Sequence, residues 1–164
     1  MLPRIPLLDK PKDFWAFSKA GRGLAELHLN YEGMFDYVQV KVEGEESKNY
    51  QVQKMTFGKT KEEVDGKNKK VSDKSVIHFN SSITIRNIPE KAYAYVVNGK
   101  SAIEWIMVSY QVTIDKKSGI ENNPNDWAEE VGNPRYILDL LLSIINVSVQ
   151  TVDIVNNLPK LDFD

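Results

Sequence analysis

The pattern in this sequence that comes nearest to a nucleotide-binding site is Gly99-Lys100-Ser101. A phosphate-binding loop reads G-x-x-x-x-G-K-[ST], because its first glycine lets the backbone amides wrap around the phosphates. Ala94 occupies the position of that first glycine here. The sequence therefore predicts a turn at Gly99 and a helix cap at Ser101, and we expect neither a nucleotide nor any other cofactor.

Two further patterns are similar to parts of catalytic sites. Residues 123–126, with the sequence NPND, are similar to the tetrapeptide with which amino-methyltransferases grip the target amine, but they lack the second proline and the aromatic residue after it. We predict a turn and a short helix capped by Asn125 or Asp126. Asp115 and Lys117 have the acid-x-Lys spacing of metal-dependent nucleases, which also arises by chance in charged loops. We therefore assign no catalytic residue and no metal ligand.

Side chains suited to nucleic acid lie in two basic segments. They are Lys67, Asn68, Lys69 and Lys70 in the first segment, and Lys116, Lys117 and Ser118 in the second. Lysine neutralises phosphates, while polar side chains such as asparagine can pair with base edges in the major groove. The plainer alternative is that both segments are solvated loops that keep the protein soluble.

Composition limits the class of protein. The chain has 164 residues, 41% hydrophobic and 27% charged, which suits one domain with a hydrophobic core. Its net charge of −2 excludes a strongly basic body, so any contact with DNA must be local. There is no cysteine, and with only His28 and His78 a histidine-rich metal site is not expected. The sequence has neither an apolar stretch long enough to span a membrane nor a secretion signal, so we expect a cytoplasmic protein with no membrane partner.

The elements that position the basic segments follow from hydrophobic spacing. Residues 13 to about 31 have the spacing of an amphipathic helix, and residues 36–88 contain short β-like runs. The charged segment 59–74, centred on Asp65 and Gly66, predicts a long exposed hairpin tip. The first basic segment would lie on this tip.

The C-terminal part is predicted to be helical. Ser101 and Glu104 have the spacing of a capping box, so a helix should begin there. Gly119 suits a turn, and the last helix is expected from Asn133, with a strand in its β-branched second half as the minor alternative. The fold is therefore predicted to be α+β: an N-terminal helix, an antiparallel sheet or meander, and a helical C-terminal section packed on the sheet.

The three tryptophans lie beside the helical stripes. They are Trp15, Trp105 and Trp127. We expect them in the core or at its edge.

A family resemblance is carried by three segments: DFWAFSKAGRGLAELHLNYE, ITIRNIPEKAYAYVVNGKSAIEWIMVSYQVTIDKKSGIENNPNDW and PRYILDLLLSIINVSVQTVDIVNNLPKL. Together they resemble the extreme C-terminus of type ISP restriction-modification enzymes and of related large bacterial proteins labelled predicted helicases. The likeness covers most of the chain, and residues 36–75 carry little of it.

The resemblance implies a non-catalytic DNA target-recognition domain at the end of a long polypeptide. In that family a nuclease, a helicase-like ATPase and an adenine-N6 methyltransferase precede it, so the implied partners are double-stranded DNA and the upstream domains of the same polypeptide. The alternative is a docking module that contacts the methyltransferase or helicase and touches DNA little, through an apolar patch around Tyr136 or the opening RIPLL. An independent hydrolase or nuclease, using Asp115, is the third interpretation.

Overall fold

The centre of the fold is α4 (Tyr136–Asn156), a helix that is apolar on nearly every side. The computed structural model describes residues 8, 10–33, 39–64 and 67–161, and at 62–64, 67 and 68 it describes the backbone alone. Among the described residues, α4 is the one helix long and apolar enough by composition to cross a membrane, but 67% of its most apolar window is buried inside the fold. It is packed as the core helix of a globular domain.

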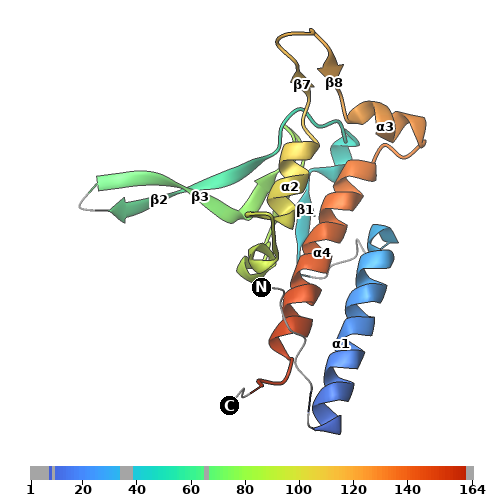
Figure 1. Ribbon diagram of the computed structural model, residues 1–164. Helices are drawn as coiled ribbons and strands as arrows, with labels where there is room; N and C mark the ends of the chain where they lie inside the picture. Colours follow the sequence, from blue (N-terminus) through green and yellow to red (C-terminus); the bar gives the residue numbers. More distant parts are fainter. Residues whose placement is uncertain (1–7, 9, 34–38, 65–66, 162–164) are drawn as a thin grey trace.

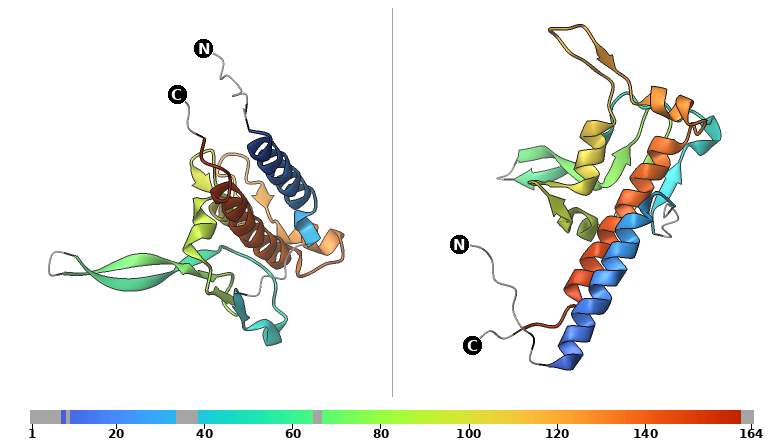
Figure 2. Two further views of the ribbon diagram at one scale, coloured as in Figure 1. Left: turned by 90° about the horizontal axis from the view of Figure 1, so that it is seen from below. Right: turned by 45° about the vertical axis from the view of Figure 1, so that its right-hand side comes forward.

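The first helix, α1 (Pro11–Leu29), lies along α4 and runs in the opposite direction (Figures 1 and 2). Its first residue is proline, whose missing N–H costs nothing at that position. A Cβ atom on Gly23 would lie 3.6 Å from Cδ1 of Ile154, so α1 packs against α4 at this glycine. The predicted N-terminal helix is confirmed.

The larger sheet is antiparallel and has the strand order β1-β4-β3-β2. Its strands are β1 (Lys41–Glu43), β2 (Thr56–Val64), β3 (Lys67–His78) and β4 (Thr84–Arg86). β2, β3 and β4 form a meander, while β1 pairs with β4. The core forms where this sheet meets α4, and its fully buried side chains include Ile77, Phe79, Ile83, Ile85, Leu138, Leu141 and Ile145. The α+β prediction is therefore confirmed.

Shorter elements complete the fold. They are η1 (Tyr31–Gly33), η2 (Glu45–Ser47), η3 (Glu90–Ala94), β5 (Val96–Val97), β6 (Lys100–Ser101), α2 (Ala102–Ser109), β7 (Thr113–Ile114), β8 (Glu121–Asn122) and α3 (Asn125–Glu130). β5 with β6 and β7 with β8 form two small hairpins. The latter projects from the body in Figure 1.

The strands and α4 differ in extent from the prediction. One of the β-like runs expected from the sequence covers residues 50–58, but β2 begins only at Thr56. The reason is that the backbone of the buried Val52 bonds to the side chain of Asn125 and not to a neighbouring strand. Most of segment 59–74 is strand, and the predicted centre at 65–66 lies outside the described residues. α4 begins at Tyr136, after a turn, and continues to Asn156, so the strand alternative is wrong.

The tryptophans are not core residues. Trp15 is 64% exposed, Trp127 is 49% exposed and Trp105 is 37% exposed, so that prediction is wrong for the first two and marginal for the third. The physical reason is that α1, α2 and α3 each bury a narrow stripe of smaller residues. α2, for example, buries Ile103 and Met107 and leaves Trp105 on its outer side.

Candidate nucleic-acid interface

The most prominent projection is the two-stranded ribbon formed by β2 and β3, which extends away from the body in every view (Figures 1 and 2). Its strands pair continuously from Lys59↔Ser72 to Val64↔Lys67. Nearer the body the register shifts between Phe57 and Gly58, which bends the ribbon at its root. The outer ribbon is therefore accessible on both faces.

The first basic segment lies on β3 and not in a loop, which corrects the predicted position. Because side chains alternate along a strand, the positions of Lys67 and Lys69 belong to one face, and those of Asn68 and Lys70 belong to the other. The side chains of Lys69 and Lys70 are exposed, while at 67 and 68 only the backbone is described. Lys69 and Lys70 therefore lie on opposite faces of the ribbon.

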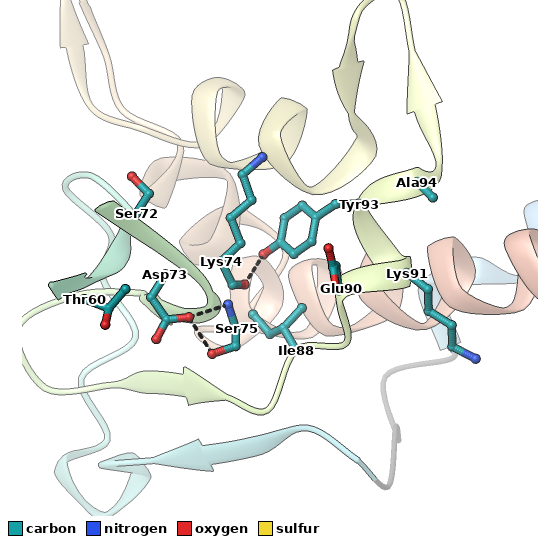
Figure 3. A pocket seen from close by; sticks show the side chains of 10 residues that line it. All are labelled: Thr60, Ser72, Asp73, Lys74, Ser75, Ile88, Glu90, Lys91, Tyr93 and Ala94. Atoms are coloured by element: carbon teal, nitrogen blue, oxygen red, sulfur yellow. Dashed lines mark hydrogen bonds between the residues drawn. The ribbon is translucent and has the colours of Figure 1, made fainter. Parts of the chain in front are cut away.

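The root of the ribbon is fixed to the body through Lys74. The Lys74 ammonium lies 3.0 Å from Oε1 of Glu104 on α2 and 5.2 Å from the ring centroid of Tyr93 on η3. The Tyr93 hydroxyl donates a hydrogen bond of 2.7 Å to the backbone carbonyl of Lys74 (Figure 3). Burial raises the pKa of Tyr93, so this hydroxyl remains a donor at neutral pH. These contacts set the direction in which the ribbon projects.

A shallow hollow of about 880 Å³ lies between the ribbon root and η3 (Figure 3). Its lining is Thr60, Ser72, Asp73, Lys74 and Ser75 from the ribbon, and Ile88, Glu90, Lys91, Tyr93 and Ala94 from the facing segment. The Ser75 hydroxyl donates a 2.6 Å bond to the Asp73 carboxylate, and this bond and that of the Ser75 amide hold the pKa of Asp73 below its ordinary value. Across the described residues, no group of three His, Cys, Asp or Glu side chains could hold a metal ion.

The second basic segment forms the turn of the β7–β8 hairpin. Oδ1 of Asp115 accepts hydrogen bonds from the amides of Ser118 at 2.7 Å and Lys117 at 3.0 Å, and from the Ser118 hydroxyl at 2.8 Å. These bonds, led by that of the Ser118 amide, lower the pKa of Asp115. Gly119 has the positive φ of +72° predicted for this turn. Asp115 therefore organises its own turn, which leaves the side chains of Lys116 and Lys117 exposed.

The two basic segments do not meet. The ribbon and the β7–β8 hairpin leave the body in different directions, and their ends lie apart in all three views (Figures 1 and 2). A single short contact cannot engage both, whereas an extended ligand that follows the surface can.

The GKS segment is the scaffold that the sequence predicts. Gly99, with φ of +83°, forms the β5–β6 turn, and the Ser101 hydroxyl accepts a hydrogen bond from the amide of Glu104. The Glu104 carboxylate accepts a 3.0 Å bond from the Ser101 amide, which completes the capping box. The capped helix α2 is the same element that fixes Lys74.

The NPND segment is also structural, but not in the predicted way. Asn125 is buried, and its side-chain amide makes two hydrogen bonds of 2.8 Å, accepting from the amide of Val52 and donating to its carbonyl. Neither Asn125 nor Asp126 caps α3, whose N-cap position is held by Pro124 with no side-chain bond. The predicted cap is wrong because Asn125 is engaged by a distant segment of backbone.

Comparison with known families decides where this architecture belongs. Residues 1–140 match the model of the type ISP C-terminal specificity domain. The chain belongs to this family. A comparison with curated proteins gave no match. The resemblance stated from the sequence is confirmed.

Solved structures agree with this assignment. The chain is 45% identical to a nuclease-deletion mutant of the type ISP restriction-modification enzyme LlaGI in complex with a DNA substrate mimic, with a TM-score of 0.78, covering 99% of this chain and 14% of that one. It is 42% identical to the ATP-dependent type ISP enzyme LlaBIII bound to DNA, again with a TM-score of 0.78, covering 99% and 10%. A DrdV–DNA complex, at 22% identity and a TM-score of 0.66 over 98% of this chain and 15% of that one, shows only that the fold is shared. This specificity domain thus spans 10–15% of the chains it matches.

Two exposed lysines of the ribbon were not among the DNA-binding residues predicted from the sequence. Lys59 and Lys61 lie on β2, and Lys61 stands directly opposite Lys70. The signal that could have found them is the Asp65-Gly66 pair: a two-residue hairpin loop fixes the register of the strands on either side of it.

Proposed function

We propose that this chain is the DNA target-recognition domain of a type ISP-like restriction-modification polypeptide. The family match over residues 1–140 carries the proposal, since the matched family is a specificity domain. Two relatives that are 42–45% identical over 99% of this chain are described as bound to DNA or to a DNA substrate mimic. The accessible ribbon supports it further, because the major groove admits a two-stranded β-ribbon.

The two projecting hairpins are the proposed contact elements. On the ribbon we assign Lys67, Asn68, Lys69 and Lys70, and on the β7–β8 turn Lys116, Lys117 and Ser118. Lysines would supply affinity through phosphates, and polar side chains would supply specificity at base edges. The Ser118 hydroxyl already donates to Asp115, so its role toward DNA is to hold the turn or to accept a hydrogen bond.

A specificity domain is not itself catalytic. We propose that residues 1–164 form one domain of a longer cytoplasmic protein, and that the nuclease, helicase-like ATPase and adenine-N6 methyltransferase activities belong to its upstream part. The share of 10–14% that this chain covers in the type ISP structures supports a much longer parent.

The test is selection of duplexes from a randomised pool by this chain. We expect enrichment of one short sequence, and weaker binding when Lys69 and Lys70, or Lys116 and Lys117, are changed to alanine. Binding should weaken as salt rises, because released counterions contribute to affinity. Equal indifference to every duplex at low salt would contradict the proposal.

A second candidate function, docking on upstream domains, is favoured by one surface. Val96, Val97, Trp105 and Val108 are exposed beside one another, and the Trp105 indole donates a 2.7 Å hydrogen bond to the Val97 carbonyl. Of the two places that the sequence suggested for an apolar patch, Tyr136 is half-buried against the core. In RIPLL, residues 4–7 lie outside the described residues and Leu8 is half-buried. Binding of the isolated upstream domains that is lost in a Trp105→Ala, Val108→Ala variant, with DNA selection unchanged, would assign docking to this patch.

A further inference from the structure

One face of the ribbon carries three lysines, Lys59, Lys61 and Lys70, which we call the lysine row. Lys61 and Lys70 are direct cross-strand partners, and Lys59 is two residues from Lys61 on the same strand, so the three side chains share a face. All three are exposed, and Ser72, the partner of Lys59, is exposed beside them. The row thus runs along the stem of the ribbon, between its root and its tip.

Within the lysine row, the cross-strand partners Lys61 and Lys70 repel each other. Cross-strand partners on one face have their Cβ atoms about 4.5–5.5 Å apart, and like charges at that spacing destabilise the pair. Among the described side chains, no carboxylate forms an ion pair with any of the three. Other lysines do have such partners: Lys74 pairs with Glu104 at 3.0 Å.

The opposite face of the ribbon is less suited to an anion. Among its described side chains it carries one lysine, Lys69, together with Thr60 and Val71, and with Asp73 nearer the root. The Asp73 carboxylate, whose pKa is lowered by its bonds from Ser75, adds a negative charge to that face at neutral pH. The two faces therefore differ in charge, and a polyanion would be attracted to the lysine row.

We propose that the lysine row binds backbone phosphates of the DNA that this domain recognises, so that this face of the ribbon turns toward the duplex. The proposal rests on the proposed function and adds the orientation of the ribbon to it. The next pair of positions toward the tip on the same face is Glu63↔Asn68, so the phosphate-binding stem leads to a position assigned to base reading. Phosphate contacts fix orientation and register, whereas base contacts specify sequence.

The test compares two triple variants with the same loss of charge. The row variant is Lys59→Gln, Lys61→Gln, Lys70→Gln. The control is Lys12→Gln, Lys19→Gln, Lys160→Gln, whose exposed lysines lie on α1 and near the C-terminal end of the described chain, away from the ribbon (Figure 1). Both change the net charge from −2 to −5 by removing three lysines. Affinity of the 164-residue chain for its selected duplex is measured as a function of salt.

The slope of log K against log salt concentration is negative, and each lysine on a phosphate adds about 0.9 to its magnitude, so the row variant should reduce that magnitude by about 2.7. The selected sequence should not change, since phosphates carry no sequence information. The control should keep the wild-type slope. Thermal unfolding should show the row variant at least as stable as wild type, because the repulsion between Lys61 and Lys70 is removed, and this excludes misfolding as the cause of weaker binding.

Three outcomes separate the two proposals. A slope of smaller magnitude in the row variant alone supports the lysine row. A wild-type slope in the row variant, or the same decrease in both variants, overturns the lysine row and leaves DNA recognition intact. Failure of the wild-type chain to bind any duplex overturns both.

Discussion

The two hydrogen bonds between Asn125 and Val52 offer a sharp test of the fold. Removing them should lower the free energy of unfolding by a different amount from removing the helix cap that the sequence predicted. Loss of a helix cap costs about 1 kcal/mol. In the structure, Asn125→Ala instead leaves the amide and the carbonyl of Val52 without their partner, and Val52 is fully buried. An unsatisfied buried polar group costs about 1–3 kcal/mol, so the two together should cost about 2–6 kcal/mol.

A neighbouring hollow of about 410 Å³, which Asn125 helps to line, could admit water to the freed groups. The lower half of the range is therefore the expected value, about 2–4 kcal/mol. The assay is denaturant unfolding of the variant beside Asp126→Ala, which removes the other predicted cap from an exposed position and should change stability by less than about 0.5 kcal/mol.

Asn125→Asp separates the two roles further. A carboxylate caps a helix as well as an amide does, but it cannot donate to the Val52 carbonyl. This variant should therefore also be destabilised, and less so at low pH, where a protonated carboxyl can donate. A loss below about 1 kcal/mol in Asn125→Ala, with wild-type stability in Asn125→Asp, would refute the two hydrogen bonds and favour the cap.

Three other predictions concern the ribbon root and its support. Ser101→Ala removes the capping-box acceptor for the Glu104 amide and should cost about 0.5–2 kcal/mol in denaturant unfolding, and full stability would exclude the box. The hydrogen bonds from Ser101 and then Lys74 lower the pKa of Glu104, so the stability that its carboxylate contributes is complete above the ordinary pKa of 4.5 and is lost as pH falls through the lower folded-state pKa. Glu104→Gln should therefore lose less stability than wild type between pH 6 and pH 3. Parallel plots of stability against pH for the two proteins would contradict this. A Cβ atom on Gly58 would lie 2.9 Å from Cβ of Val76, so Gly58→Ala should cost about 1–3 kcal/mol by overpacking, whereas Gly21→Ala, in open space on α1, should not destabilise.

Features set by neighbours in the sequence were predictable. Ser101 and Glu104 form the predicted capping box because both partners lie within one helical turn. Gly119 adopts the positive φ expected of its turn for the same local reason. The helices and the antiparallel sheet also followed, since hydrophobic spacing reports which face is buried.

Features set by residues far away in the sequence could not be predicted. Asn125 looks like a cap in its own segment, and its actual partner is 73 positions away. Trp15 lies beside the helical stripe and was expected in the core or at its edge, but only a narrow stripe of α1 reaches α4, which leaves this side chain exposed. The lysine row needed the cross-strand register of Lys61 with Lys70, which a loop-based interpretation of the charged segment did not supply.

The most direct measurement of the central claim is a domain exchange. The region of LlaGI that matches this chain is replaced by residues 1–164, and the DNA sites that the chimaeric enzyme modifies are determined by sequencing. The account predicts that these sites carry the sequence that the isolated chain selects from a random pool. An active chimaera that modifies the original LlaGI sites, when the pool selects a different sequence, would contradict it.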